Sequence, residues 1–106
     1  MTTLTTSFPV TRIAQSRIKD VDFNNLEFGK YISDHMLMAD FLSGKWQEPV
    51  IVPFGDIPMS PAMLSLHYGQ SVFEGMKAFL NKNGDICIFR PQKHSERLNK
   101  SLARMC

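Results

Sequence analysis

The fold is decided by residues 66–79, which read LHYGQSVFEGMKAF. Two aromatic residues, Tyr68 and Phe73, lie where we expect a helix to end and an extended segment to begin. In an extended segment Phe73 and Gly75 share one face, because successive side chains alternate, and Glu74 takes the other face. A glycine beside a large aromatic residue leaves a shallow floor. The stretch therefore suits a backbone that passes close beneath a flat ligand, although a glycine at this position equally marks a bulge.

The helix before this stretch is predicted from its capping residues. Ser60 is a candidate N-cap, and Pro61 stands at the first helical position, where the missing N–H is of no consequence. A short helix then runs to about Tyr68, and Gly69 ends it.

A hairpin and a second helix are predicted after the stretch. The strands are residues 72–80 and 85–89, and the Asn83-Gly84 step in the loop between them is a strong hairpin signal. Pro91 opens the helix, which has one face of residues at helical spacing. This face consists of His94, Leu98, Ser101, Leu102 and Met105.

The part of the chain before residue 58 gives weaker signals. Residues 31–41 fit a strand with apolar side chains on both faces, although a helix fits residues 36–41 as well. Residues 43–45 predict a turn, and residues 48–54 predict a short strand whose two prolines suit a sheet edge. Together the elements predict a small α+β fold, with a short antiparallel sheet and flanking helices.

Composition excludes several classes of protein. The chain has 106 residues, a formal net charge of +2 and 21% charged residues, which is too balanced for a nucleic-acid reader. No stretch approaches the roughly 20 apolar residues that a membrane span needs. Cys87 lies in an apolar run, which predicts a reduced thiol in the core, and Cys106 is the only other cysteine. Few cysteines and no signal peptide indicate the cytoplasm.

Few residues qualify for chemistry by themselves. Arg97 lies at the border of the apolar helix face, where a guanidinium can hold a phosphate, but spacing alone favours a solvent-facing side chain that pairs with Glu96 or another nearby acid. Glu74 requires a basic partner if it is buried, and the sequence does not identify one. Lys77 shares the predicted face of Phe73, so a Schiff-base role is not excluded by its position, although the edge hairpin disfavours it. The three histidines have no zinc-binding spacing, and we expect no metal site.

Several motifs, taken together and in order, give a resemblance to a known family. They are Phe28-Gly29-Lys30, Asp34-His35-Met36-Leu37-Met38, Leu66-His67-Tyr68, Phe73-Glu74-Gly75-Met76-Lys77-Ala78-Phe79, Phe89-Arg90-Pro91, Arg97 and Arg104-Met105-Cys106. From about Phe23 to its last residue the chain resembles the N-terminal part of a branched-chain amino acid aminotransferase, a pyridoxal-phosphate enzyme of fold type IV.

The resemblance implies roles for four residues. Arg97 matches the arginine that binds the phosphate of pyridoxal 5′-phosphate. Phe28, Tyr68 and Phe73 match aromatic residues that line the pocket for the branched side chain of the substrate. The implied reaction transfers the amino group of leucine, isoleucine or valine to 2-oxoglutarate, giving glutamate and a branched 2-oxo acid.

The resemblance also implies what the rest of such an enzyme supplies. The catalytic lysine and the acid that pairs with the pyridinium nitrogen lie in the family's C-terminal domain, so we expect no catalytic residue in this chain and no activity from it alone. We expect an N-terminal extension at 1–22 and an incomplete small domain at 23–106. Apolar surface should be exposed where the remainder and a second subunit would pack, in a homodimer or larger homo-oligomer.

Two other functions remain open at this stage. The lobe can serve as a binding or subunit-interaction module without catalysis. The same fold type also includes D-amino acid aminotransferases and aminodeoxychorismate lyases, although the motif at 34–38 and the step at 76–78 favour the branched-chain enzymes.

Overall fold

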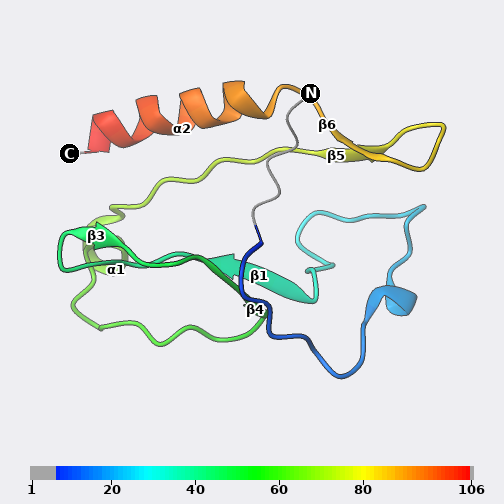
Figure 1. Ribbon diagram of the computed structural model, residues 1–106. Helices are drawn as coiled ribbons and strands as arrows, with labels where there is room; N and C mark the ends of the chain where they lie inside the picture. Colours follow the sequence, from blue (N-terminus) through cyan, green and yellow to red (C-terminus); the bar gives the residue numbers. More distant parts are fainter. Residues whose placement is uncertain (1–6, 106) are drawn as a thin grey trace. The chain divides into compact units, whose positions relative to one another are not determined.

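The structure is a computed structural model, and it describes residues 7–105 (Figure 1). The chain forms two compact units, Met1–Ile57 and Pro58–Cys106. The residues described contain three antiparallel strand pairs, a 3-10 turn and two α-helices, so the predicted small α+β composition is confirmed. Cys106, part of the last motif of the family resemblance, lies outside the described residues.

The first unit is organised by two antiparallel pairs. β1 (His35–Met38) pairs with β4 (Val50–Pro53), with Leu37 opposite Ile51 (Figure 1). β2 (Phe41–Leu42) and β3 (Lys45–Trp46) form a hairpin. The strand predicted over 31–41 is thus shorter than expected, and the prediction of a turn at 43–45 is confirmed, with the turn residues Ser43 and Gly44 both at positive φ.

The β4 strand lies between two neighbours at Ile51. Besides its pairing with β1, Ile51 exchanges backbone hydrogen bonds with the segment at Val10: its N–H donates to the Pro9 carbonyl, and Thr11 N–H donates to the Ile51 carbonyl, both at 2.9 Å. The prediction that residues 48–54 form an edge strand is therefore wrong at Ile51. Prolines at 49 and 53 are compatible with this because neither interrupts the bonds of Ile51.

Asp34 fixes the segment before β1. Its carboxylate accepts from Ser16 Oγ at 2.6 Å and from the backbone N–H and the Nε of Arg17, each at 3.1 Å. These donors, with the serine hydroxyl the largest cause, lower the pKa of Asp34. Close by, the 3-10 turn η1 (Ile18–Asp20) begins directly after Arg17.

The first helix of the second unit begins later than its cap predicted. α1 spans Leu64–Tyr68, and Met63 rather than Ser60 stands at its N-cap position. Ser60 instead makes a turn, since its Oγ accepts the Ala62 N–H at 3.2 Å and its carbonyl accepts the Met63 N–H at 3.1 Å. The predicted end is confirmed: Gly69 is left-handed at φ 62°, and its N–H donates to the Leu64 carbonyl.

The predicted hairpin is present but shorter than expected. β5 (Ala78–Leu80) pairs with β6 (Ile86–Ile88), and the Oδ1 of Asn81 accepts the N–H of Asn83 and of Asp85 in the loop. Residues 72–77, predicted as part of the first strand, form no regular structure. A strand needs a partner for its backbone groups, and no described residue pairs with this segment as a strand.

The second helix is confirmed from its first residue. α2 runs Pro91–Met105, and residues 70–77 lie alongside it (Figure 1). Its apolar face is only partly covered, with His94 and Leu98 half-buried and Leu102 and Met105 exposed.

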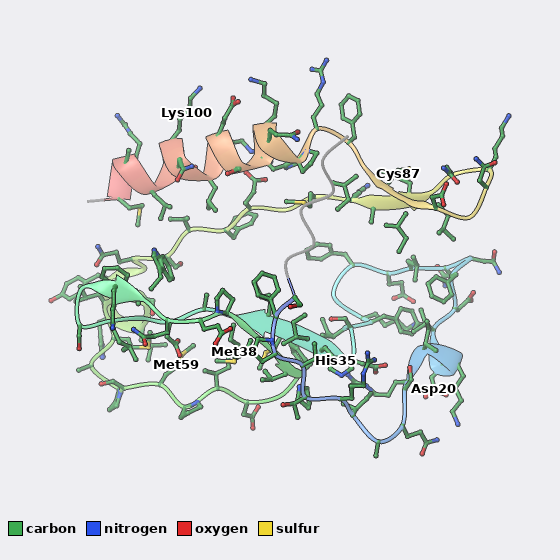
Figure 2. All side chains as sticks on the ribbon, viewed as in Figure 1. Asp20, His35, Met38, Met59, Cys87 and Lys100 are labelled. Atoms are coloured by element: carbon green, nitrogen blue, oxygen red, sulfur yellow. The ribbon has the colours of Figure 1, made fainter. Side chains whose placement is uncertain are left out.

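A fully buried side chain is absent from residues 7–105, and large apolar side chains are exposed in both units. The expectation of exposed apolar surface is confirmed. The predicted core position of Cys87 is wrong: it lies on β6 and is exposed (Figure 2). A two-stranded hairpin covers neither of its own faces, and all six residues of β5 and β6 are exposed.

Candidate functional site

The candidate site lies along the first two turns of α2. The basic residues near the start of α2 are Arg90, Lys93, His94 and Arg97. On the helix, Arg97 is four residues after Lys93 and three after His94, and residues at these two spacings are neighbours on a helix surface. Arg90 precedes the helix at a positive φ of 49°. A pocket of about 180 Å³ is lined by Phe89, Arg90, Lys93, His94 and Arg97. Pro91 begins the helix directly after Arg90, and the pocket is lined by residues from both sides of this boundary.

Arg97 is held by Glu74 through a two-point ion pair. Its Nε donates to Glu74 Oε2 at 2.6 Å, and its Nη2 donates to Oε1 of the same carboxylate. Two parallel bonds of this kind fix the plane of a guanidinium as well as its distance. The sequence predicted that Glu74 needs a basic partner if it is buried. Arg97, 23 residues later, is this partner.

Two further groups contact the Glu74 carboxylate. The backbone N–H of Gly75 donates to Oε1 at 2.9 Å, and Nδ1 of His94 lies 3.2 Å from the same oxygen. The Glu74 side chain is only 11% exposed, whereas that of Arg97 is 64% exposed. The carboxylate thus occupies the inner side of the cluster, and part of the guanidinium stays in solvent.

The pKa values of both partners follow from this arrangement. The hydrogen bond from Arg97 is the largest cause that lowers the pKa of Glu74, to about 2 from an ordinary 4.5, with His94 and the Gly75 N–H acting in the same direction and burial opposing them. The Glu74 carboxylate raises the pKa of Arg97. Both groups are therefore charged at neutral pH.

We expect Glu74 to titrate with a midpoint near 2 in the folded protein, because protonation must break its bonds to Arg97. A carboxyl whose folded pKa is depressed stabilises the fold above its unfolded pKa, and loses that contribution as the pH falls through the folded value. The contribution of Glu74 is thus complete above pH 4.5 and is lost on the way down to about 2. Carbon-detected NMR of the side-chain carboxyl measures the midpoint.

The matched variant for this titration is Arg97→Gln, which removes the charge and the two-point geometry. It should move the Glu74 midpoint up toward 4.5. A native midpoint already near that value would contradict the ion pair.

The donor set of the pocket suits a phosphate anion. Three of its lining residues are cations, and two of these are offset by acids, Arg97 by Glu74 and Lys93 by Glu96 at 2.7 Å. Arg90 supplies the remaining positive charge. The pocket also lies beside the N-terminal turns of α2, where the helix dipole favours negative charge. Guanidinium groups bind phosphate oxygens in a two-point geometry, so these residues fit a phosphate ester.

The predicted pocket aromatics do not gather around this anion site. Tyr68 and Phe73 belong to the same unit as Arg97, with 82% and 94% of their surface exposed, and neither lines the basic pocket. Phe28 lies in the other unit and is fully exposed. Their assignment to a substrate pocket stays a prediction.

A second pocket is lined in part by the residues that connect Tyr68 to Phe73. It has a volume of about 390 Å³ and is lined by Gln70, Ser71, Val72, Leu102 and Met105. The Nε2 of Gln70 donates to the Met105 carbonyl at 3.5 Å, so this part of the stretch contacts the last turn of α2. That residues 66–79 pass beneath a flat ligand stays a prediction.

The sequence analysis missed the role of Glu74 and His94 as contacts of Arg97. The sequence did indicate that Glu74, if buried, needs a cation. It could not identify Arg97 as that cation, because the two residues are 23 positions apart. Among residues 7–105 there is also no group of three or more His, Cys, Asp or Glu placed to hold a metal ion. None of the helices in that range is long and apolar enough to cross a bilayer.

Comparison with known proteins gives consistent relatives. A probable branched-chain-amino-acid aminotransferase of Staphylococcus aureus (strain MRSA252) is 51% identical over 85 residues, which are 79% of this chain and 24% of the relative. Branched-chain-amino-acid aminotransferase 2 of Bacillus subtilis (strain 168) is 44% identical over 86 residues, 80% of the chain and 24% of the relative. The branched-chain-amino-acid aminotransferase of Mycolicibacterium smegmatis is 36% identical over 96 residues, 90% of the chain and 26% of the relative.

These matches confirm the resemblance drawn from the sequence motifs. The chain spans about a quarter of the length of the curated relatives it matches, and it is similar to their N-terminal portion. No family model matches the chain.

Proposed function

We propose that this chain, which matches the N-terminal quarter of branched-chain-amino-acid aminotransferases, is the corresponding part of such an enzyme. The whole protein would transfer the amino group of leucine, isoleucine or valine to 2-oxoglutarate. The observation that carries this proposal is the similarity itself, from 51% identity over 79% of the chain to 36% identity over 90% of it.

The cofactor of the proposed reaction is pyridoxal 5′-phosphate. When bound, it supplies an electron sink for the amino group transfer. In this chain Arg97 would hold its phosphate, and the basic pocket along α2 supports that assignment because its donors suit a phosphate ester. Orienting the phosphate fixes the position of the reacting group at a distance from it.

Tyr68, Phe73 and Phe28 would form the apolar wall that receives the branched side chain of the substrate. Their exposure supports this role, since a solvated aromatic ring gains free energy when an aliphatic group covers it. The same contact excludes water from the reacting atoms. The groups that bond the cofactor and move the proton would come from the remainder of the whole protein.

Further parts of the proposal concern assembly and place. Residues 23–106 would form the N-terminal small domain of a fold-type IV enzyme, with residues 1–22 as an extension. The exposed apolar side chains in both units support packing against the remaining domain and a second subunit, in a homodimer or larger homo-oligomer. The balanced charge and absence of a membrane helix among residues 7–105 are compatible with a cytoplasmic enzyme.

An assay of the product of the whole open reading frame that contains this sequence tests the function. The protein is incubated with pyridoxal 5′-phosphate, 2-oxoglutarate and one amino acid, and glutamate is measured. We expect turnover with leucine, isoleucine and valine. A preference for D-alanine would instead identify the D-amino acid enzymes. A folded, cofactor-bound protein that forms glutamate from none of the branched amino acids would refute the proposal.

A further inference from the structure

Residues 70–77 form no helix or strand, and one carboxylate of this segment contacts α2. That carboxylate belongs to Glu74, and both of its oxygens accept from Arg97. One of them also accepts from Gly75 N–H and contacts His94. With 11% of its side chain exposed, Glu74 is well shielded from water for an ion, since no residue among 7–105 is fully buried.

The contacts leave one edge of the guanidinium open. Nε and Nη2 face Glu74, and within residues 7–105 no hydrogen bond uses Nη1. Arg97 lines the basic pocket, while Glu74 does not. An anion in this pocket therefore meets the free edge of the guanidinium and the other cations, and the carboxylate lies behind Arg97.

A long side chain that is already fixed loses less conformational freedom when it binds a ligand. A free arginine samples many rotamers, and ordering a side chain of this kind weakens binding by about 3- to 10-fold. The two-point pairing with Glu74 sets both the distance and the plane of the guanidinium before any anion arrives. Nδ1 of His94 lies 3.4 Å from Nη2 of Arg97 and so contacts both members of the ion pair.

We propose that Glu74 is a positioning residue that holds Arg97 in the geometry in which its free edge binds a phosphate ester. This inference rests on the proposed function, since it takes the phosphate of pyridoxal 5′-phosphate as the ligand. Glu74 does not touch that ligand and acts only through Arg97. The opposite role, a carboxylate that competes with phosphate for Arg97, predicts the opposite change in affinity and is separated from it by experiment.

The test measures cofactor affinity of the whole protein, by the absorbance and fluorescence of the bound cofactor, with two probes. Pyridoxal 5′-phosphate carries the phosphate and pyridoxal lacks it. In Glu74→Gln and Glu74→Ala we expect the Kd of pyridoxal 5′-phosphate to rise about 3- to 10-fold, with the Kd of pyridoxal unchanged. In an Arg97→Ala background, Glu74→Ala should have no further effect, because the residue it positions is gone.

Each other result overturns a defined claim. An unchanged or tighter Kd for pyridoxal 5′-phosphate in both Glu74 variants rejects the positioning role, and a tighter one identifies competition. An equal loss for both probes assigns Glu74 a general structural role instead. Circular dichroism checks folding, and Glu74→Gln, which keeps the shape of the side chain, decides the question if Glu74→Ala does not fold. Wild-type protein that binds no pyridoxal 5′-phosphate rejects the proposed function itself.

Discussion

Replacing Arg97 with alanine is expected to raise the Kd of pyridoxal 5′-phosphate roughly 10- to 100-fold in the whole protein, because a hydrogen bond to a charged group contributes about 1.5–3 kcal/mol. Of the two arginines that line the basic pocket, Arg97 is the one with the two-point contact to Glu74. Arg97→Lys should recover only part of the affinity, since an ammonium group cannot bond two oxygens in one plane.

The control is Lys100→Ala, which removes the same charge from the same helix. Lys100 is exposed on α2 and does not line the pocket (Figure 2). Its loss should leave the Kd near the wild-type value, because the pocket keeps all of its lining residues. A second control is pyridoxal, whose affinity should not change in Arg97→Ala. Equal affinity of wild type and Arg97→Ala for pyridoxal 5′-phosphate would refute the phosphate assignment.

The parts of the fold that were predicted correctly depend on local chemistry. Gly69 ends a helix because a glycine adopts φ near 60° without strain, and Pro91 begins one because its missing N–H has no bond to make there. The loop at 81–84 turns the chain because Asn81 bonds the backbone within four residues. Each signal and its consequence lie within a few positions of each other.

The parts that were wrong depend on distant partners. Residues 72–77 alternate like a strand, but a strand exists only where another strand supplies hydrogen bonds, and α2 is their neighbour instead. Cys87 has apolar neighbours in sequence, but burial depends on what covers a hairpin, and within residues 7–105 β6 is uncovered.

In the candidate site, too, local features were predicted and a distant contact was not. The position of Arg97 predicted a pairing with a nearby acid, the family resemblance implied its phosphate role, and the position of Glu74 predicted an acid in need of a cation. The pairing of the two required the tertiary contact between residues 70–77 and α2. The ion pair uses Nε and Nη2 of Arg97, and the phosphate role of this residue stays a proposal.

Phe73→Ala is expected to lower kcat/KM for leucine by roughly 10- to 100-fold in the whole protein, because burying a Phe side chain against an aliphatic group contributes about 1.5–3 kcal/mol. The argument depends on exposure. With 94% of its surface in solvent, Phe73 contributes almost no packing to the fold of residues 7–105. A loss of activity after its truncation therefore points to contacts with substrate, or with parts of the whole protein that complete the pocket.

The choice of substrate separates these two causes. Alanine as the amino donor has a methyl group that reaches little of an aromatic wall, so Phe73→Ala should reduce the ratio of the leucine to the alanine kcat/KM. A general loss of structure would lower both values together and leave the ratio unchanged. Phe79→Ala removes the same ring from β5, where Phe79 is 59% exposed, and it should not alter the ratio. If Phe73→Ala and Phe79→Ala behave alike, Phe73 is no part of the pocket wall, and within the stretch at 66–79 only Tyr68 and Glu74 keep a proposed role.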